Sequence, residues 1–393
     1  MKNAHILISG AGIAGSATAL MLQRYGFTPT VIERAPVLPE GGYAVDFRGT
    51  AHMQVLERMG ILAEIQRRQT HMGAVAHVDA HSKVLAYAPA EVLSGDVEIL
   101  RGDLAHVLHD ATRNEVEYIF DDAITSLVET DDGVQVSFAH GAPRQFDLVV
   151  GADGLHSNVR SLVFGPEAQY IRNLGYYVAI FTVPNFLNLD HTGRYYNIPN
   201  KLAGIYSARD NTEAKAMMVF AAPHLDYDRR NLAQQKQLLA DVFAGVGWEV
   251  PRILDAMWNA PDFYFDAQSQ IHMERWSQGR VVLVGDAGYG ATMGGMGTGL
   301  AVVGSYILAG ELAAAQGDHT LAFPRYEQLL RAYAAGCQEF ATHAGPYLAP
   351  SSNGRIWMRN QMYRMLPHLP WKGLISKMST KAANAITLKT YPI

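Results

Sequence analysis

The sequence predicts an α/β protein in which a lobe built on a parallel sheet is interleaved with a lobe built on an antiparallel sheet. Three observations support this prediction. Residues 5–33 have the strand–helix–strand pattern of a parallel sheet. Residues 124–150 form alternating runs with turn residues between them. Residues 176–220 alternate apolar and polar positions and contain many aromatics, which is typical of an open antiparallel sheet with one covered face.

The N-terminal segment is predicted to be a βαβ unit. Its first strand is the short apolar run HILIS (His5–Ser9), which suits a buried parallel strand. A helix follows the stretch GAGIAG and ends near Tyr25, because Gly26 stands in the usual C′ position. The β-branched run TPTVI (Thr28–Ile32) predicts the second strand, which ends at Glu33.

The remaining elements follow from turn residues and periodicity. Asp132-Gly133 is a hairpin signal and Gly141 marks a second turn. We therefore expect a small antiparallel meander that leads into a buried strand at Phe146–Val150. The expected helices are Asn231–Ala244, Pro251–Ala260, one from about Gly297, and Lys372–Ile386 after an irregular tail that begins near Pro346.

The composition indicates a globular chain with a large core: of 393 residues, 49% are hydrophobic and 18% are charged. A formal net charge of -5 without a basic run argues against nucleic acid as a partner. The lone cysteine, Cys337, excludes an internal disulfide and reads as a small buried side chain, with a reactive thiol as the alternative. No signal peptide is evident, and no run approaches the roughly 18 apolar residues of a membrane span. We therefore expect a cytoplasmic protein.

The stretch GAGIAG has the pattern G-x-G-x-x-G. It follows a strand, opens a helix and is followed by Glu33 at the end of the next strand, which is the context that dinucleotide binding requires. Gly10 permits the tight turn, Gly12 lets the backbone approach a pyrophosphate, and Gly15 lets helix and strand pack closely. The helix N-terminus attracts phosphates. The Glu33 carboxylate can accept hydrogen bonds from ribose hydroxyls and would repel a 2′-phosphate.

Three further segments contain candidate contacts. Arg34 suits the adenosine edge, with a surface arginine as the alternative. Arg101, in EILRGDL, precedes a helix that Asp103 can N-cap, and it is alternatively a salt-bridge partner. The stretch GADG places Asp153 and Gly154 in a strand–turn–helix. The Asp153 carboxylate can reach the pyrophosphate region or orient neighbouring groups. Alternatively, the stretch is an ordinary turn with a cap.

The stretch GDAGYGATMGGMGTGLA (Gly285–Ala301) connects an apolar strand to a helix. Seven of its seventeen residues are glycine, although glycine costs backbone entropy wherever the chain must be ordered. Such a loop is favourable where the backbone itself must lie against a ligand. A merely flexible surface loop, the alternative, fits poorly with an apolar strand and a helix at its two ends.

These motifs together resemble the class A FAD monooxygenases, the aromatic hydroxylases typified by para-hydroxybenzoate hydroxylase. The resemblance rests on GAGIAG, Glu33-Arg34, GADG and GDA, whose order and spacing cover most of the chain. A closer similarity is to the tetracycline destructases and their relatives. It rests on GGYAVDFRG (Gly41–Gly49), VEILRGDL (Val97–Leu104), NLGYYVAIFTVPNFLNLDH (Asn173–His191) and GSYILAGEL.

The resemblance implies a Rossmann-type FAD-binding domain with the glutathione reductase-like topology of para-hydroxybenzoate hydroxylase. The expected boundaries are 1–72, 99–172 and 268–345 for the FAD-binding domain, 73–98 and 173–267 for an antiparallel-sheet substrate domain, and 346–393 for a C-terminal helical segment. The implied cofactor-binding residues are Gly10, Gly12, Ala14, Gly15, Glu33, Arg34, Asp46, Arg101, Asp153, Gly154, Asp286, Gly295, Met296 and Gly297.

The family implies a role for several of these residues. Glu33 would hold the adenosine ribose, Arg101 would contact FAD with Asp46 close by, and Asp153 would serve both FAD and NAD(P)H. Asp286 would bind the ribityl chain. The helix from about Gly297 would then point its positive end at the N1–C2 carbonyl edge of the flavin, where the reduced cofactor is anionic.

The implied reaction is hydroxylation of a polycyclic phenol or enol, such as a tetracycline-type antibiotic or another aromatic polyketide. NAD(P)H would reduce FAD, and O2 would form a flavin C4a-hydroperoxide that donates its distal oxygen. Because there is no second G-x-G-x-x-G fold, the reductant would visit transiently. Arg48 is the candidate cation for an ionised substrate, with a structural ion pair as the alternative. The aromatic strands at 176–220 would line the substrate pocket or form ordinary core.

One departure from the family affects the glycine-rich loop. Where the family usually has a proline and G-Q-G, this chain has Thr292-Met293 and Gly295-Met296-Gly297. FAD binding should persist because its contacts are mostly with the backbone, but the oxygen pocket changes shape. A flavin-dependent reductase or dehydrogenase, and a flavoprotein that only sequesters ligands, therefore remain alternatives. No metal site is predicted, since CxxC and HExxH are absent, and we expect a monomer or weak dimer.

Overall fold

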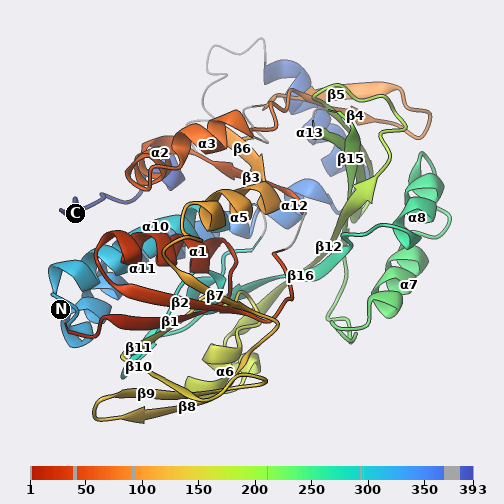
Figure 1. Cartoon of the computed structure of the whole chain (residues 1–393). Coiled ribbons are helices and arrows are strands. Elements are labelled where there is room, and N and C mark those ends of the chain that lie inside the picture. The colour runs from red at the N-terminus through yellow and green to blue at the C-terminus, as the bar shows by residue number, and fades with distance from the viewer. Residues whose placement is uncertain are drawn as a thin grey trace.

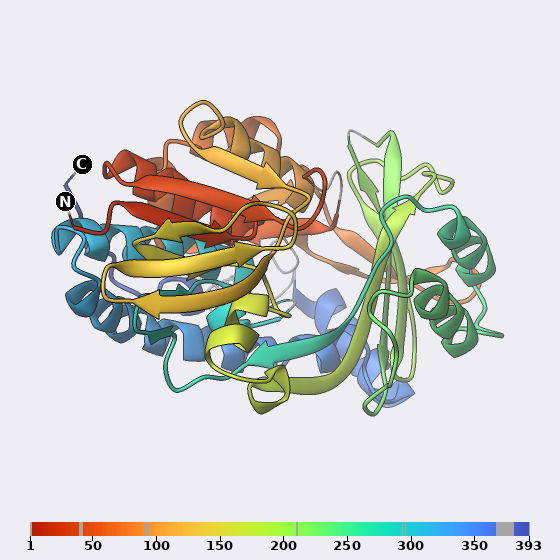
Figure 2. The same cartoon turned by 60° about the horizontal axis from the view of Figure 1, so that its bottom comes forward.

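The computed structural model describes residues 2–38, 42–90, 94–209, 211–292, 294, 296–366 and 381–392. It contains two lobes side by side, and both described ends of the chain lie in the first lobe (Figure 1). The second lobe is a sheet with two helices on its outer side (Figure 2). Its strands are antiparallel as predicted, except that residues 193–196 and 75–78 pair in parallel. The predicted α/β fold with interleaved lobes is confirmed.

The first lobe is organised by a sheet with the strand order β17-β18-β11-β1-β2-β7. Its strands are β1 (His5–Ser9), β2 (Thr28–Glu33), β7 (Glu117–Phe120), β11 (Leu148–Gly151), β17 (Ser277–Gln278) and β18 (Val281–Leu283). Strand β1 lies parallel to β2 and β11, and β17 alone is antiparallel to its neighbour. Ile6 and Ile8 pack toward the helices while Leu7 packs toward the opposite face. Burial on both faces explains the continuous apolar runs.

Helices cover one face of this sheet, and a meander covers the other. The helices of this lobe are α1 (Ile13–Arg24), α2 (Gly49–Arg58), α3 (Leu62–Arg67), α5 (Arg101–Asp110), α6 (Asn158–Val163), α9 (Asp286–Tyr289), α10 (Gly297–Ala314), α11 (His319–Ala341) and the short 3-10 helix η1 (Glu167–Gln169). The meander is β8 (Ile124–Thr130), β9 (Gly133–Phe138) and β10 (Arg144–Phe146), antiparallel as predicted. Its Val134 and Val136 pack against the same cluster as Leu7.

The second lobe has the strand order β16-β12-β15-β14-β13-β4-β5. These strands are β4 (Val75–Val78), β5 (Val84–Ala88), β12 (Ile171–Val183), β13 (Gly193–Ile198), β14 (Lys201–Ala208), β15 (Glu213–Ala221) and β16 (Tyr264–Ile271). The helices α7 (Leu232–Val242) and α8 (Val250–Trp258) cover its outer face, where Phe220, Phe243 and Ile253 form a core. Between the lobes, β3 (Ala44–Phe47) pairs with β6 (Val97–Leu100).

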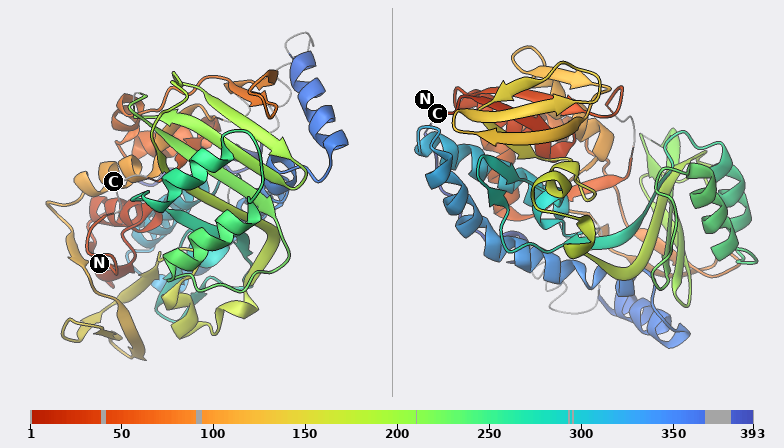
Figure 3. Two further views of the ribbon diagram at one scale, coloured as in Figure 1. Left: turned by 90° about the vertical axis from the view of Figure 1, so that its right-hand side faces the viewer. Right: turned by 90° about the horizontal axis from the view of Figure 1, so that it is seen from below.

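The C-terminal region differs from the prediction. The stretch near Pro346, expected to be irregular, contains α12 (Ala344–Leu348), and α13 (Asn353–Met365) follows. With α11 they run along both lobes (Figure 3). Helix α13 forms because Ser352 caps it by accepting a hydrogen bond from the Arg355 amide at 3.3 Å. Of the helix expected at Lys372–Ile386, residues 372–380 lie outside the described residues, and 381–383 are helical.

Three smaller predictions can be compared with the structure. Gly26 has a φ of 82° after α1, as the C′ position requires. Asp103 is not an N-cap, because α5 already begins at Arg101 and Asp103 lies inside its first turn. Cys337 is buried as expected, and burial raises the pKa of its thiol to about 12.

One described helix has the length and mean hydropathy of a membrane span, although polar residues interrupt its apolar run. Helix α10 is long and apolar enough to cross a membrane by length and composition. Most of this helix is buried within the first lobe, where it packs beside α1. Its apolar character therefore serves the core of the lobe.

Candidate cofactor and active site

The GAGIAG turn requires glycine at its first and last positions. Gly10 has a φ of 103°, and a Cβ atom there would lie 2.6 Å from the carbonyl oxygen of Ala152. A Cβ atom at Gly15 would lie 1.8 Å from the carbonyl oxygen of Gly10. The two glycines therefore allow β1, β11 and α1 to approach one another, as the sequence predicts.

Gly12 faces open space instead. For a Cβ atom added at this position, the nearest atom of the described chain would be Nη2 of Arg101, at 4.0 Å. Gly12 is also the N-cap of α1, and within the described residues no side chain caps this helix. The amides of its first turn are thus available to an anion in front of Gly12, where the helix dipole is also favourable.

Glu33 is held against the same turn. Its Oε2 accepts a hydrogen bond from the Ala11 amide at 2.8 Å, and its Oε1 accepts one from the Ala35 amide at 2.9 Å. Each carboxylate oxygen has a second lone pair, so the group retains capacity for ribose hydroxyls. Arg34 is exposed beside it.

Arg101 lies beside the space in front of Gly12, and its charge reaches Asp286. The amide of Arg101 donates to the carbonyl oxygen of Tyr43 at 2.9 Å, which fixes the start of α5. Burial raises the pKa of Asp286, while the charge of Arg101 lowers it. Asp286 is nevertheless accessible to solvent. We call the space bordered by Gly12, Arg101 and Asp286 the cleft.

The backbone around Asp286 brings three helices together. Gly285 has a φ of 66° and a ψ of -142°, a conformation that suits glycine. A Cβ atom there would lie 2.9 Å from the Cβ of Ala14 in α1. A Cβ atom at Gly297, the first residue of α10, would lie 3.8 Å from Oδ1 of Asp286. The N-termini of α1, α9 and α10 therefore meet at one site.

The glycine-rich loop reaches α10 through left-handed residues. Thr292, Gly294 and Met296 have φ values of 69°, 76° and 57°. Met296 is the N-cap of α10 and is buried, and no side chain in the described chain caps this helix. Met293 and Gly295 lie outside the described residues. The positive end of α10 is thus presented to the cleft by backbone alone.

Arg48 and Asp46 form an ion pair with each other. Arg48 precedes α2 as its N-cap, and its amide donates to Nδ1 of His52 at 3.1 Å. The structural ion pair, the alternative raised for Arg48, is therefore present. Both side chains lie at the junction of β3 and α2, between the two lobes.

Asp153 is engaged by the helix that follows it. Its Oδ2 accepts hydrogen bonds from the amides of Asn158 at 2.9 Å and Val159 at 3.0 Å, and Ser157 contacts its Oδ1. Gly154 has a φ of 81°, and no described atom lies within 4 Å of a Cβ added there. In this structure the GADG motif is a turn with a carboxylate cap, the ordinary reading of that sequence.

Three residues of the cleft were not singled out from the sequence. The rings of Tyr43 and Tyr264 lie 5.8 Å apart. Surrounding protein atoms raise the pKa of both hydroxyls, although 39% of Tyr264 remains exposed. Asp266 lies two residues along β16 from Tyr264, and its charge acts on Tyr43, Tyr264 and Asp286. The sequence signal available was that Tyr264 and Asp266 stand two residues apart on one strand. Which elements that strand faces is visible only in the fold.

The second lobe contributes an apolar and aromatic face. On the side of the sheet opposite α7 and α8, it forms a cluster with which Tyr43 packs. The buried members of that cluster are Val75, Val178, Ile180, Tyr195, Leu202, Tyr206, Met217, Val219 and Ala349. Burial raises the pKa of the Tyr195 and Tyr206 hydroxyls, so both stay neutral.

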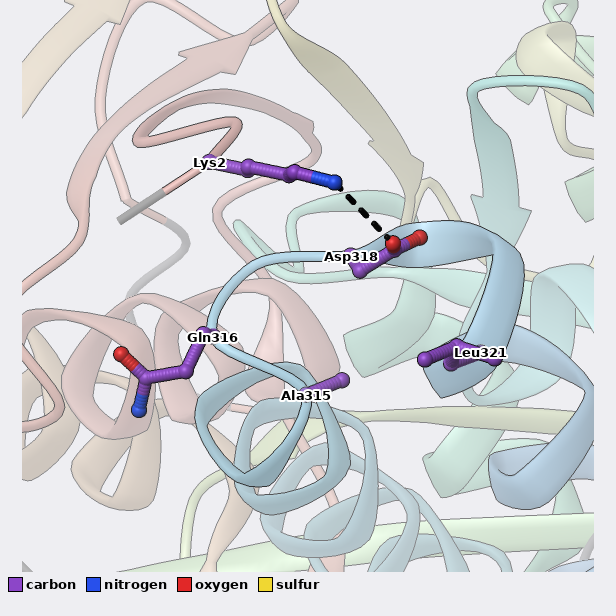
Figure 4. Close-up of a pocket in the computed structure, with 5 residues that line it drawn as sticks. All are labelled: Lys2, Ala315, Gln316, Asp318 and Leu321. Carbon is purple, nitrogen blue, oxygen red and sulfur yellow. Dashed lines mark hydrogen bonds and ion pairs between the residues drawn. The ribbon is translucent and has the colours of Figure 1, made fainter.

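A surface depression of about 400 Å³ lies elsewhere, at the α10–α11 turn near the N-terminus. Lys2 and Asp318 span it with an ion pair of 3.4 Å (Figure 4). It contains none of the residues described above, and we assign it no role in the site.

The residues fit FAD. The space in front of Gly12, the uncapped amides of α1 and the guanidinium of Arg101 suit a pyrophosphate. Glu33 suits the adenosine ribose. Asp286 lies on the polypeptide segment that leads into α10.

Comparison with known proteins agrees with this geometry. Residues 3–345 match the family model described as an FAD binding domain. An uncharacterised protein of Mycobacterium tuberculosis is 48% identical over 328 residues, covering 82% of this chain and 88% of that protein. A flavin-dependent monooxygenase of Legionella longbeachae is 41% identical over 344 residues, covering 86% and 88%. The crystal structure of tetracycline destructase Tet(55) superposes with a TM-score of 0.85 at 39% identity, covering 100% of both chains. The chain therefore belongs to the class A flavin-dependent monooxygenases, the FAD-binding family that its motifs predicted.

Proposed function

We propose that the protein uses NAD(P)H and O2 to hydroxylate a flat, polycyclic phenol or enol, with tetracyclines or other aromatic polyketides as the substrate class. The observation that carries this proposal is the open space in front of Gly12, beside Arg101, with Asp286 accessible and within range of the Arg101 charge. Its resemblance over the whole chain to a tetracycline destructase supports the substrate class. Because reduced nicotinamides are intracellular reductants, we expect the protein to act in the cytoplasm.

The first lobe would hold the cofactor. The first turn of α1 and Arg101 would bind the pyrophosphate, Glu33 the adenosine ribose and Asp286 the ribityl chain. When bound, FAD would accept the reducing equivalents of NAD(P)H and activate O2. The uncapped N-terminus of α10 would stabilise negative charge on the ring system through its amides and dipole.

The second lobe would hold the substrate. The paired rings of Tyr43 and Tyr264 would offer apolar faces that suit stacking against a flat molecule, with the buried tyrosines Tyr195 and Tyr206 behind them. They would also exclude water from the space between the lobes. Arg48 would stabilise an ionised substrate oxygen from the edge of this space. Since Asp46 already compensates its charge, we expect the contribution of Arg48 to be modest.

The test is to incubate the purified protein with NADPH, tetracycline and air, with catalase present to remove free H2O2. We expect the gain of one oxygen atom in the drug by mass spectrometry, bleaching of its absorbance, and NADPH oxidation stimulated by the drug. If another polycyclic phenol alone stimulates oxidation and gains oxygen, the reaction class holds and the drug assignment falls. Stimulated NADPH oxidation without oxygen in any product would refute the monooxygenase proposal.

A flavin-dependent reductase or dehydrogenase is the second candidate. It is favoured by the glycine-rich loop, where Thr292 and Met296, both non-glycine residues, take left-handed conformations beside α10. Such a loop changes the space available to O2. Product formation from the same substrates without O2, with NADPH consumed in equal amount, would establish this alternative.

A further inference from the structure

A cluster of titratable and charged side chains joins the two lobes beside the cofactor site. It comes from the GADGLHS turn (residues 151–157), helices α6 and η1, the loop before α7 and strand β16. Its members are His156, Arg160, Glu167, Tyr227, Arg229 and Asp266. His156 lies two residues after the GADG motif, and the proposed function leaves this histidine without a role.

His156 stands between two carboxylates. Its Nε2 lies 3.2 Å from Oδ2 of Asp266, and its Nδ1 lies 3.0 Å from Oε2 of Glu167. Both distances are those of hydrogen bonds. The three groups therefore form a continuous carboxylate–imidazole–carboxylate chain.

This chain needs one proton more than a neutral imidazole provides. A neutral imidazole donates from one nitrogen and accepts at the other. With both carboxylates ionised, one of the two contacts would then bring lone pair against lone pair. Hydrogen bonds at both contacts therefore require one extra proton on His156, Asp266 or Glu167; without it, Nδ1 accepts from Arg229 and the link to Glu167 is open. Burial raises the pKa of Asp266 and of Glu167, which helps these carboxyl groups to share it.

One end of the chain lies at the cleft. Asp266 shares a face of β16 with Tyr264, and its charge acts on Tyr43, Tyr264 and Asp286. Its side chain is 13% exposed, whereas that of His156 is 30% exposed and that of Glu167 is 22% exposed. Asp266, at the cleft end, is therefore the least exposed of the three groups, while His156 and Glu167 both reach solvent.

The other groups of the cluster hold this geometry. Oδ1 of Asp266 accepts from the Tyr227 hydroxyl at 3.3 Å and from the Ala267 amide at 2.8 Å, which leaves Oδ2 to His156. Arg160 donates to Oε2 of Glu167 at 3.0 Å. Arg229 donates to Oε1 of Glu167 at 3.2 Å and also contacts Nδ1 of His156, so it competes with Glu167 for that nitrogen.

We propose that Glu167, His156 and Asp266 form a proton path between solvent and the cofactor cleft. In the inward direction, Glu167 takes a proton from water and passes it from Oε2 to Nδ1 of His156. The proton on Nε2 moves to Oδ2 of Asp266 in the same event. One O–H and one N–H bond break while one N–H and one O–H bond form, so one proton is carried per event. The proposal deepens the proposed function and rests on its FAD site, but not on the substrate.

The first test measures the shared proton directly. In the oxidised FAD-bound protein labelled with 15N-histidine, the His156 resonances are assigned by their loss in His156→Gln. We expect the titration midpoint of His156 to fall by about one pH unit or more in Asp266→Asn, since that substitution removes the adjacent negative charge. An unchanged midpoint would overturn the shared-proton arrangement.

The second test measures transport without substrate or NADPH. When reduced FAD is reoxidised by O2 to give H2O2, one proton beyond those on the reduced flavin is taken up. In His156→Gln, which retains hydrogen-bonding capacity, we expect reoxidation to slow about tenfold or more and free imidazole to restore part of the rate. His272→Gln, a substitution of a histidine outside the cluster, serves as the control and should match the wild type.

The two outcomes separate this proposal from the proposed function. Wild-type reoxidation in His156→Gln, with a lowered melting temperature, would show that the cluster is only a structural link between lobes. A slow His156→Gln variant in a protein that hydroxylates no phenol would retain the path and reject the substrate. A protein that binds no FAD would reject both.

Discussion

Two glycines of one motif should respond to alanine in opposite ways. Gly12→Ala introduces a Cβ whose nearest described neighbour is a guanidinium nitrogen at 4.0 Å. The backbone of Gly12, with a φ of -72° and a ψ of -173°, accepts alanine. We therefore expect the FAD-free protein to fold with a change of no more than about 1 kcal/mol in the free energy of unfolding.

Binding of FAD should suffer much more. The new methyl group occupies the space in front of α1, so a pyrophosphate loses contact with the first-turn amides. The loss of two charge-assisted hydrogen bonds, at roughly 1.5 kcal/mol each, raises the Kd for FAD about a hundredfold. The matched substitution Gly15→Ala places its Cβ 1.8 Å from the Gly10 carbonyl oxygen. That overlap forces the backbone apart and should destabilise the fold itself by about 3 kcal/mol or more.

The assay pairs urea unfolding of the FAD-free variants with titration of FAD by quenching of its fluorescence. Wild-type affinity in Gly12→Ala would refute the assignment of the pyrophosphate to this space. An unfolded Gly12→Ala would instead show that the space is filled by protein. A Gly15→Ala variant with normal stability would refute the packing argument.

Three further predictions follow. Glu33→Ala loses the bonds to two amides and those to ribose, so FAD affinity should fall at least about tenfold in the same titration, and unchanged affinity would make Glu33 structural only. Asp286→Ala should weaken FAD and release more H2O2 per NADPH while circular dichroism is unchanged; full coupling would contradict the ribityl role. Burial lowers the pKa of His52 to about 4 and of His77 to about 3, with Arg48 and Arg359 adding to the effect. Both stay neutral in the folded state, whereas the unfolded chain binds protons below pH 6.5. Each should therefore remove roughly 1.4 kcal/mol of stability per pH unit from about pH 6.5 toward 4, and a flat profile in urea unfolding would contradict their burial.

Local patterns were sufficient where function depends on the backbone. The GAGIAG turn was predictable because Gly10 and Gly15 are required by contacts within a few residues or with the adjoining strand. The glycines of the same stretch also predict that no side chain caps the N-terminus of α1. The position of Glu33 was predictable because it ends the strand that follows this helix. The glycine-rich approach to α10 was predictable for the same reason, since a backbone that must meet a ligand excludes side chains.

Long-range contacts determined what the side chains do. Arg48 pairs with Asp46, and Asp153 caps α6, through contacts that the motifs alone left open between two readings. Helix α13 was missed because, besides its Ser352 cap, it depends on burial of Tyr363 against β5, which no periodicity in a polar segment reveals.

The sequence by itself determined the parallel sheet, its dinucleotide turn and the family, because these reside in short motifs with fixed spacing. Only the tertiary structure decided that Tyr264 and Asp266 face the cleft and that His156 lies between two carboxylates. Strand β16 reaches the GADGLHS turn from more than a hundred residues away along the chain. Which side chains meet there depends on how two lobes pack, and packing is a property of the whole chain.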